Sequence, residues 1–490
     1  MVQQTIQSAP QQVPTPTVFV LFGATGDLAR RMVLPAFYDL FCRGLTPPQW
    51  VLVGNGRGEN TVGIDFPAHV RSSLEEFGPG KGNIDESQWK DFSGRLRFAA
   101  GDFDQTGDDS LVAVINSAAD GLGDKHQFVH YLAVPPVAFT ETAKGLSDHG
   151  LLKNAKVVFE KPYGTSLKTF TELDNLVHSV MDEDQVFRID HFLGKEATQN
   201  LHVLRFGNAM INRIWSADAI AQVQIDAPEP LGIAQRAKFY DATGAFKDMI
   251  ATHLFQVAAE VAMEPPASLH PDDLQTARES VLSSFRPLAP EDVVLGQFDG
   301  YTEIDKIAED STTDTLAAVR LWVDTDRWRG VPFVLRSGKR MAGNDQLVSL
   351  IMKETEGPLG DLPDSAARIE ISLKGSGSIS VALVMKRPGP DLTLAEERIL
   401  LSLGELQDGD ALDPYVALIH DVLLGDRSLF TSSDGLLHAW RAADPVLTSP
   451  PKPLPYEPGS WGPKEAEALT DGLGWMTERP DAVTPKTSGD

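Results

Sequence analysis

The pattern of apolar residues changes near residue 200, and no other feature of the sequence constrains the fold as strongly. Before this point, short apolar runs are separated by stretches of helical spacing, which is typical of a parallel α/β sheet with helices on its faces. After it, many apolar runs alternate with polar residues and end in turns, which is typical of a mainly antiparallel sheet. Because 490 residues exceed one typical hydrophobic core, the sequence predicts two domains of different architecture.

The predicted domains cover residues 18–189 and 190–476, between a disordered tail at 1–17 and a flexible tail at 477–490. The strands expected in the first domain are at residues 18–22, 50–53, 128–134 and 157–159. Those expected in the second are at 219–225, 313–323, 331–336, 347–353, 368–373 and 378–385. A few helices are expected to cover the second sheet.

Charge and composition exclude several classes of partner. A net charge of −26 argues against nucleic acid or an anionic membrane, since both require a basic face. A single cysteine, Cys42, excludes an intramolecular disulfide framework and a multi-cysteine metal site. The first residues lack the pattern of a signal peptide, and no run of eighteen apolar residues occurs. We therefore expect a soluble cytoplasmic protein in which a local basic cluster binds any anionic ligand.

The turn after the first predicted strand has the glycine spacing of a dinucleotide-binding site. It reads GATGDLA at residues 23–29, where Gly23 permits a tight turn and Gly26 allows the backbone to approach a pyrophosphate. This predicts a Rossmann-like domain with cofactor contacts at Gly23, Thr25, Gly26, Asp27 and Leu28. Such turns also occur in α/β proteins that bind no phosphate, so the turn alone leaves both readings open.

Arg57 indicates which dinucleotide the domain prefers. It follows the second predicted strand, where NAD sites usually carry an acid for the ribose 2′-hydroxyl, whereas an arginine accepts the 2′-phosphate of NADP. The alternative is an exposed arginine at a strand end. The sequence favours NADP as the cofactor.

Residues 188–196 read RIDHFLGKE and concentrate titratable groups. From the segment alone, they are either the start of a solvated helix or part of a functional site. The wider context favours the second reading. The motifs FGATGDLARR, VGNGR, YLAVPP, FEKPYG, RIDHFLGKE, RFGN, GAFKDMIATHLFQ, MEPP, VPFVLRSGK, DPYVALIHDVLLGD and GSWGP follow one another at the order and spacing found in one family. From about residue 18 to 475, the chain resembles the glucose-6-phosphate dehydrogenase family.

The resemblance implies oxidation of glucose 6-phosphate at C1 by NADP, in the oxidative pentose phosphate pathway, by at least a homodimer formed through the large sheet. It implies catalytic roles for His253 as general base and Asp241 as the carboxylate beside it. Implied substrate contacts are Lys161, Asp190, His191, Lys195, Glu229, Asp241 and Lys339. Of these, His191 and Lys195, four apart and expected on one helical face, are implied to bind the phosphate dianion. Further implied cofactor contacts are Arg57, Phe103, Asp104, Pro135 and Lys161. Without the resemblance, His253 would be read as a core histidine and Lys161 as a surface lysine.

Four positions depart from the family pattern. Phe192 stands where a tyrosine is usual, Ser166 where an aspartate is usual, Asn344 where a second base often appears, and Lys374-Gly375 where Gln-Pro is usual. Neighbouring Arg340 is an alternative source of the base missing at Asn344. We expect these changes to weaken phosphate binding and to leave hydride transfer intact. Two alternatives remain: a paralogue with altered sugar or cofactor preference, and a catalytically silent partner of the same fold. No metal is expected, because no cluster has ligand spacing in the sequence and the chemistry needs none.

Overall fold

The computed structural model describes residues 14–58, 61, 63–79, 83–233, 236–354, 367–405 and 411–479. The two predicted tails lie outside the described residues except for their inner ends. Thr17 already belongs to the first strand, and a short 3-10 turn occupies Met476–Glu478. No helix among the described residues is long and apolar enough to cross a membrane.

The first sheet is parallel throughout and has the strand order β3-β2-β1-β4-β5-β6. Its strands are β1 (Thr17–Phe22), β2 (Trp50–Gly56), β3 (Leu96–Ala100), β4 (Gln127–Leu132), β5 (Ala155–Phe159) and β6 (Val186–Arg188). Buried runs such as TVFVLF in β1 explain the sheet, because strands covered on both faces are apolar throughout. The predicted Rossmann-like architecture is confirmed.

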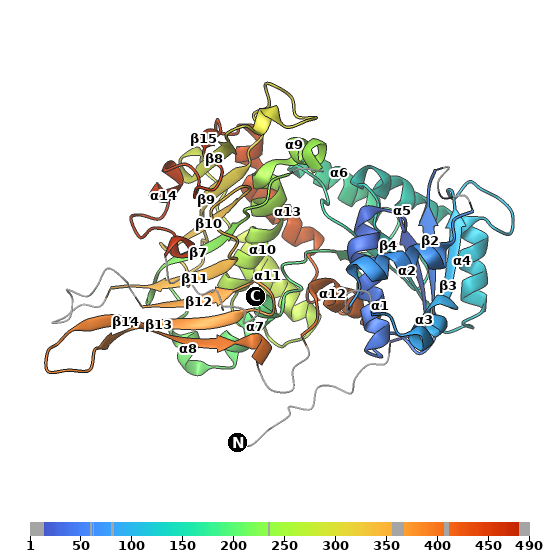
Figure 1. Ribbon diagram of the computed structural model, residues 1–490, viewed down its shortest axis with the longest axis horizontal. Coiled ribbons are helices and arrows are strands. Elements are labelled where there is room, and N and C mark those ends of the chain that lie inside the picture. Colours follow the sequence, from blue (N-terminus) through green and yellow to red (C-terminus); the bar gives the residue numbers. More distant parts are fainter. Residues whose placement is uncertain are drawn as a thin grey trace, which may run out of the picture.

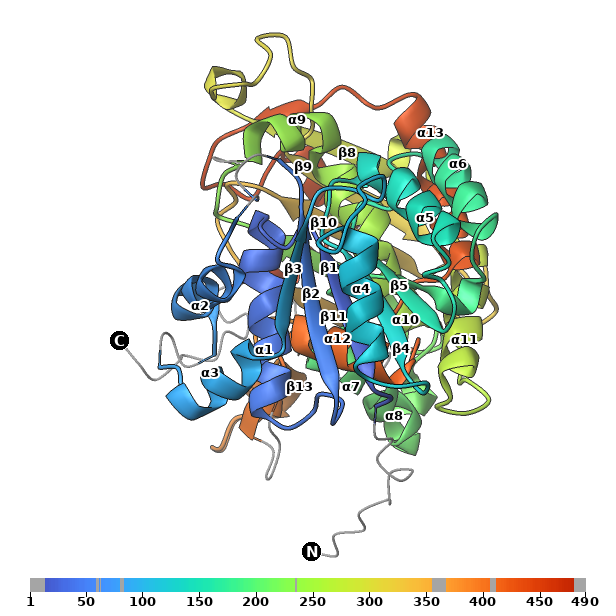
Figure 2. The same ribbon diagram turned by 90° about the vertical axis from the view of Figure 1, so that its right-hand side faces the viewer.

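Helices cover both faces of this sheet (Figure 2). They are η1 (Ala29–Val33), α1 (Leu34–Cys42), α2 (Phe66–Phe77), α3 (Glu86–Ser93), α4 (Leu111–Asp120), α5 (Phe139–Asp148) and α6 (Leu167–His178). The strand order reverses between β1 and β4, and ligands of such sheets bind beyond the carboxyl ends of the strands at that point. The order of the strands therefore places a ligand crevice next to Gly23.

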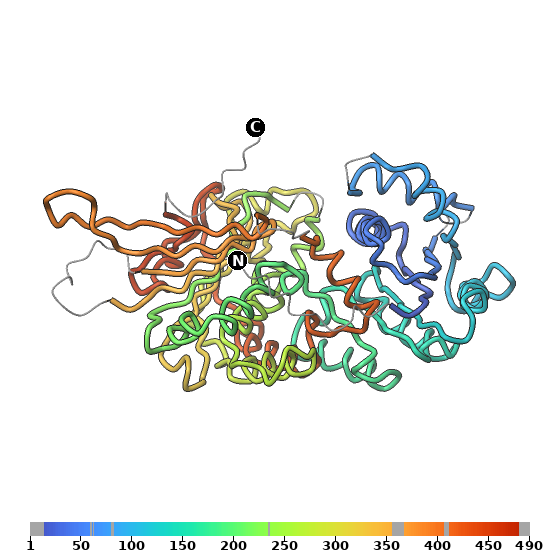
Figure 3. Tube along the Cα trace, turned by 90° about the horizontal axis from the view of Figure 1, so that it is seen from below, coloured from blue at the N-terminus to red at the C-terminus, as the bar shows by residue number. Residues whose placement is uncertain are grey.

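The second sheet is mixed, mainly antiparallel, with the order β14-β13-β12-β11-β7-β10-β9-β8-β15. Only the pairs β7–β10 and β8–β15 are parallel among those recorded. Its strands are β7 (Ile220–Pro228), β8 (Val293–Phe298), β9 (Leu316–Trp322), β10 (Pro332–Gly338), β11 (Leu347–Met352), β12 (Arg368–Ser372), β13 (Ser378–Lys386), β14 (Leu394–Ser402) and β15 (Leu454–Tyr456). Figure 3 shows the β13–β14 hairpin projecting at the end far from the first sheet.

Helices fill the space between the two sheets (Figure 1). They include α7 (Glu196–Phe206), η6 (Phe246–Leu254), α10 (Phe255–Ala262), α11 (Pro271–Ser283) and α13 (Ser433–Thr448). The remaining helices are α8 (Ala209–Ile214), α9 (Ala237–Ala245), α12 (Pro414–Leu424) and α14 (Glu465–Ala468). Helix α12 packs against α1, and α13 packs against α6, so late segments of the chain contact the first domain. One hydrophobic core contains buried residues of both sheets, including strands β1 and β11, so the two domains pack against each other through apolar side chains.

The predicted helical face at residues 188–196 is wrong. Arg188 ends β6, residues 191–194 form a turn, and α7 begins only at Glu196, so His191 and Lys195 do not share a helix. The Asp190 carboxylate fixes this turn, because it accepts a hydrogen bond from the Phe192 N–H at 2.9 Å.

Candidate active site

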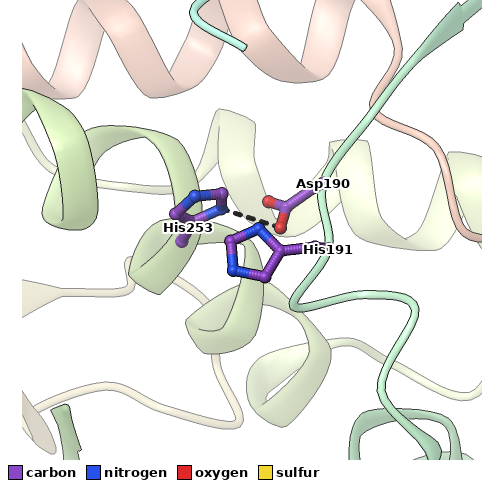
Figure 4. A group of neighbouring side chains, drawn as sticks. All are labelled: Asp190, His191 and His253. Atoms are coloured by element: carbon purple, nitrogen blue, oxygen red, sulfur yellow. Dashed lines mark hydrogen bonds and ion pairs between the residues drawn. The ribbon is translucent and has the colours of Figure 1, made fainter. Parts of the chain in front are cut away.

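A hydrogen-bonded chain of three side chains lies between the domains. His253 Nδ1 is 2.8 Å from Asp190 Oδ1, and His253 Nε2 is 2.6 Å from Lys161 Nζ. Figure 4 shows Asp190 and His253 facing each other with His191 beside them. An ammonium can only donate, so Nε2 accepts from Lys161 and the proton on Nδ1 is donated to Asp190. The imidazole is therefore held in one tautomer, with its lone pair on Nε2.

The two domains bring these residues together by different means. Strands β5 and β6 are neighbours and parallel, so Lys161 and Asp190, each two residues past its strand, emerge at the same edge of the sheet. His253 comes from η6, a π-helical turn that leads into α10. Single π turns inside helices often occur at functional sites.

Burial determines the charge state of the base. The His253 side chain is 1% exposed, and its burial, followed by the nearby Lys161 ammonium, holds its pKa well below the ordinary value. Burial also raises the pKa of Asp190 to about 6. At neutral pH, His253 is thus a neutral base beside a carboxylate that is mostly ionised.

Asp248 is a site residue that the sequence did not reveal. Its Oδ1 accepts a hydrogen bond from Lys161 Nζ at 3.1 Å, and its backbone carbonyl accepts another at 3.2 Å. Burial by itself raises the pKa of Asp248, but Lys161 and His253 outweigh it and bring the pKa down to about 2. The carboxylate therefore stays charged and holds the Lys161 ammonium beside His253.

His191 and Lys195 lie next to each other in the turn before α7. Burial, followed by the nearby His253 and Lys161, holds the pKa of His191 well below its ordinary value, so the positive charge here comes from Lys195. The rings of His191 and His253 are 4.6 Å apart between centroids, and the Lys195 ammonium lies 4.3 Å from the centroid of the Phe192 ring. Lys195 Nζ donates to the Leu373 carbonyl at 3.0 Å and also to the Gln346 side chain, which are neutral acceptors. Burial lowers the pKa of Lys195 to about 8. At neutral pH the Lys195 ammonium therefore keeps its positive charge, and the acceptors recorded for it among the described residues are neutral groups.

Glu229 and Lys339 enter from the large sheet. Each follows one of the parallel neighbours β7 and β10, and Lys339 Nζ is 2.6 Å from Glu229 Oε2. The Lys339 ammonium also contributes to lowering the pKa of Asp248, which places this pair near the site.

Asp241 lies elsewhere than expected. Its Oδ1 accepts hydrogen bonds from Tyr301 at 3.0 Å and from Ser311 at 2.5 Å. The carboxylate that contacts His253 is Asp190, so the predicted contact of Asp241 with the base needs correction. Asp241 and His253 do not lie on one continuous helix, because the backbone is kinked at Gly244, with φ of 73° and ψ of 168°, near the end of α9. Its contact with the sugar remains a prediction.

The glycine turn at the cofactor end has the geometry expected of a phosphate cradle. Gly23 has φ of 75°, and a Cβ there would lie 2.3 Å from the Ala133 carbonyl oxygen, so no other residue fits. Thr25 and Gly26 follow in the turn, Asp27 is exposed and Leu28 is partly buried. The turn leads into a helix, and the free N–H groups at a helix N-terminus are suited to bind a phosphate. These residues fit a pyrophosphate.

Arg57 follows β2 but is already engaged. It pairs with Asp102 and, at 3.1 Å, with Glu141, and its side chain is 41% exposed. Phe103 stacks on His149 with centroids 5.6 Å apart, while Asp104 and Pro135 are exposed. A surface cleft is lined by Asp102, Phe103, Asp104 and Glu141 among others. Of the predicted cofactor residues, Phe103 and Asp104 line this cleft, and Arg57 pairs with two acids that also line it, Asp102 and Glu141.

The expectation about metal ligands requires one qualification. Asp190, His191 and His253 offer ligand atoms within 4.8 Å of one another, a grouping that the sequence spacing did not indicate. The Lys161 ammonium next to His253 Nε2 would repel a metal cation bound to these three residues. Proton transfer is therefore the role that this arrangement favours.

A dinucleotide fold whose strands end beside a desolvated histidine base suits one class of enzyme, the nicotinamide-dependent dehydrogenases that oxidise an alcohol. Comparison with known proteins gives the family. Residues 20–200 match "Glucose-6-phosphate dehydrogenase, NAD binding domain", and residues 202–476 match "Glucose-6-phosphate dehydrogenase, C-terminal domain". The chain belongs to the glucose-6-phosphate dehydrogenase family.

Individual relatives agree along nearly the whole chain. Glucose-6-phosphate 1-dehydrogenase 2 of Mycobacterium tuberculosis is 36% identical over 499 residues, covering 96% of each chain. The enzyme of Dictyostelium discoideum is 33% identical, again over 96% of each. The crystal structure of the Mycobacterium avium enzyme superposes with a TM-score of 0.82 at 33% identity, covering 94% of this chain and 99% of that one. The predicted family, fold class and NADP-dependent oxidoreductase activity are confirmed.

Proposed function

We propose that the chain oxidises D-glucose 6-phosphate at C1 with NADP, giving 6-phosphogluconolactone and NADPH. The observation that carries the proposal is the Asp190–His253–Lys161 chain, a buried neutral base at the junction of the dinucleotide fold and a cationic pocket. A solved structure described as glucose-6-phosphate dehydrogenase in complex with its substrate glucose-6-phosphate superposes with a TM-score of 0.86 at 29% identity.

The proposed chemistry needs one proton acceptor and one hydride acceptor. NADP, held by the turn at residues 23–28 and by Arg57, supplies the hydride acceptor. His253 Nε2 takes the proton of the C1 hydroxyl, which must occupy the position next to Nε2 where Lys161 Nζ now lies. Asp190 stabilises the imidazolium that results, and Asp248 holds the displaced ammonium of Lys161.

The remaining site residues have proposed binding roles. His191 and Lys195 bind the phosphate, while Lys161, Glu229, Asp241 and Lys339 contact the sugar. Asp190 acts on substrate through His253. A cytoplasmic location and a homodimer or homotetramer built on the large sheet are part of the same proposal.

The test is a nicotinamide-reduction assay that crosses glucose 6-phosphate, other hexose 6-phosphates and free glucose with NADP and NAD. The proposal expects the highest kcat/KM for glucose 6-phosphate with NADP. A different preferred hexose phosphate would favour the paralogue reading, and no reduction by a folded, cofactor-binding protein would favour the silent partner. The acids beside Arg57 make the NAD arm informative, because they offset the charge that would select NADP.

A further inference from the structure

The turn between β12 and β13 carries a lysine, Lys374, next to the residue that accepts a hydrogen bond from Lys195. We propose that Lys374 supplies a positive charge for the substrate phosphate and replaces the basic side chain that Asn344 lacks. This inference rests on the proposed function, because it assigns a ligand to a residue at the edge of that site.

The contacts place Lys374 beside Lys195. Lys195 Nζ donates to the carbonyl of Leu373, the residue immediately before Lys374. The backbone N–H of Leu373 donates to the Gln346 carbonyl at 2.7 Å, and the Gln346 side chain binds Lys195. The segment at 344–346 therefore runs alongside residues 373 and 374, and both segments meet at the ammonium of Lys195.

The position of the Lys374 ammonium is fixed across these two segments. Lys374 Nζ donates to Asn344 Oδ1 at 2.8 Å. An amide oxygen orients the ammonium but does not neutralise it, in contrast with the carboxylates that pair with Arg57. The departures at positions 344 and 374 are thus linked, because the neutral side chain of Asn344 positions the ammonium of Lys374.

The turn that carries Lys374 is held against the helix that follows Lys195. Gly375 and Gly377 have φ of 60° and 86°, and the Gly377 N–H donates to the Lys374 carbonyl at 3.0 Å. A Cβ at Gly377 would lie 2.6 Å from the Ala197 Cβ in α7. Because the turn packs this closely on the first turn of α7, the backbone positions of Lys374 and Lys195 are fixed relative to each other.

The charges at this edge suit a phosphate dianion. Lys195 is largely buried and its pKa is lowered to about 8, so it loses its proton more readily than an ordinary lysine. Lys374 is exposed at the rim and adds a second ammonium. Under this proposal, Lys374 on the facing turn offsets the cation missing at Asn344, whereas the sequence led us to expect weaker phosphate binding.

The decisive variant is Lys374→Gln, which keeps a polar side chain of similar length and removes the charge. The matched control is Lys353→Gln, an exposed lysine just beyond the other end of β11. KM and kcat are measured for glucose 6-phosphate, together with competitive inhibition by inorganic phosphate. We expect Lys374→Gln to raise KM and the inhibition constant for phosphate about three- to tenfold with kcat unchanged, and Lys353→Gln to change neither.

Rescue distinguishes binding from a structural effect. In Lys374→Gln, adding Asn344→Arg restores a cation from the other segment and should bring KM back to within about twofold of the original value. An unchanged KM and phosphate inhibition in Lys374→Gln would overturn the proposal, as would an equal effect in the control. If the original protein does not oxidise glucose 6-phosphate, the proposed function fails, and inhibition or binding measured with inorganic phosphate still tests Lys374 separately.

Discussion

Replacing Asp190 by asparagine isolates the charge beside the base. Asp190 Oδ1 accepts from both His253 Nδ1 at 2.8 Å and the Phe192 N–H at 2.9 Å, and an amide oxygen can accept both. Asp190 Oδ2 is buried without a hydrogen-bond partner among the described residues, so the new NH2 group takes a place where no bond is lost. The substitution therefore removes a negative charge while the tautomer of His253 is kept.

The size of the effect follows from the charge on His253 in the transition state. A carboxylate 2.8 Å from the developing imidazolium contributes about 6 kcal/mol at an effective dielectric constant of about 20. The neutral amide keeps a hydrogen bond worth about 1 kcal/mol, so the net loss is about 5 kcal/mol. We expect kcat to fall about 10³- to 10⁴-fold, with the KM for glucose 6-phosphate nearly unchanged because Asp190 acts through His253.

The pH dependence of kcat distinguishes loss of the Asp190 charge from a change in the protonation state of His253. Loss of a neighbouring anion lowers the pKa of His253 further, and the base form is the one present above the pKa. His253 is therefore already unprotonated at neutral pH, and raising the pH cannot restore the rate. We expect the same loss of kcat at about pH 7 and about pH 8.

The control is a second buried carboxylate–histidine pair among the described residues. Glu260 is 1% exposed and pairs with His202 and Arg278 rather than with His253. Glu260→Gln should lower Tm and change kcat of the folded protein far less than Asp190→Asn, although Arg278 also acts on the pKa of Asp190. If Asp190→Asn retains kcat within about threefold, or if its loss appears in KM alone, the electrostatic reasoning is refuted.

Three further outcomes are expected. Arg57→Ala should raise the KM for NADP about tenfold and barely alter the KM for NAD. Glu141→Gln should lower the KM for NADP, because it frees the Arg57 guanidinium from an ion pair. Equal changes in the KM for both cofactors in steady-state kinetics would show that Arg57 has a structural role. Lys195 binds as an ammonium, which exists below its pKa of about 8, so the KM for glucose 6-phosphate should rise above that pH, and Lys195→Arg should abolish the rise. Gly377→Ala should destabilise the protein by about 2 kcal/mol or more in chemical denaturation, since its Cβ would meet Ala197.

Much of the fold could be predicted because its signals are local. The run at residues 18–22 followed by GATGDLA predicted a strand, a turn and a helix, and the structure has β1, the left-handed Gly23 and η1 with α1. Strands with weak apolar patterns were not predicted. In β14, residues such as Ile399 and Leu400 are exposed and charged residues intervene, so the sequence lacks the alternation that a half-buried strand shows.

The family resemblance supplied candidate site residues but not their contacts, and it missed Asp248. Asp248 and His253 are five residues apart, which on an α-helix separates them by about 140°, whereas the π-helical turn of η6 brings them to the same side. Likewise, the pairing of Asn344 with Lys374 depends on segments 30 residues apart meeting across the sheet. The pattern of single residues carries no information about either contact.

The most direct test of the account is a single-turnover measurement of hydride transfer in His253→Asn, with the binding of glucose 6-phosphate and NADP measured on the same protein. The account predicts that both ligands bind within about threefold of their original affinity while the rate of nicotinamide reduction falls at least about 10²-fold. Near-normal reduction by the folded variant would contradict it and would make His253 a packed core histidine.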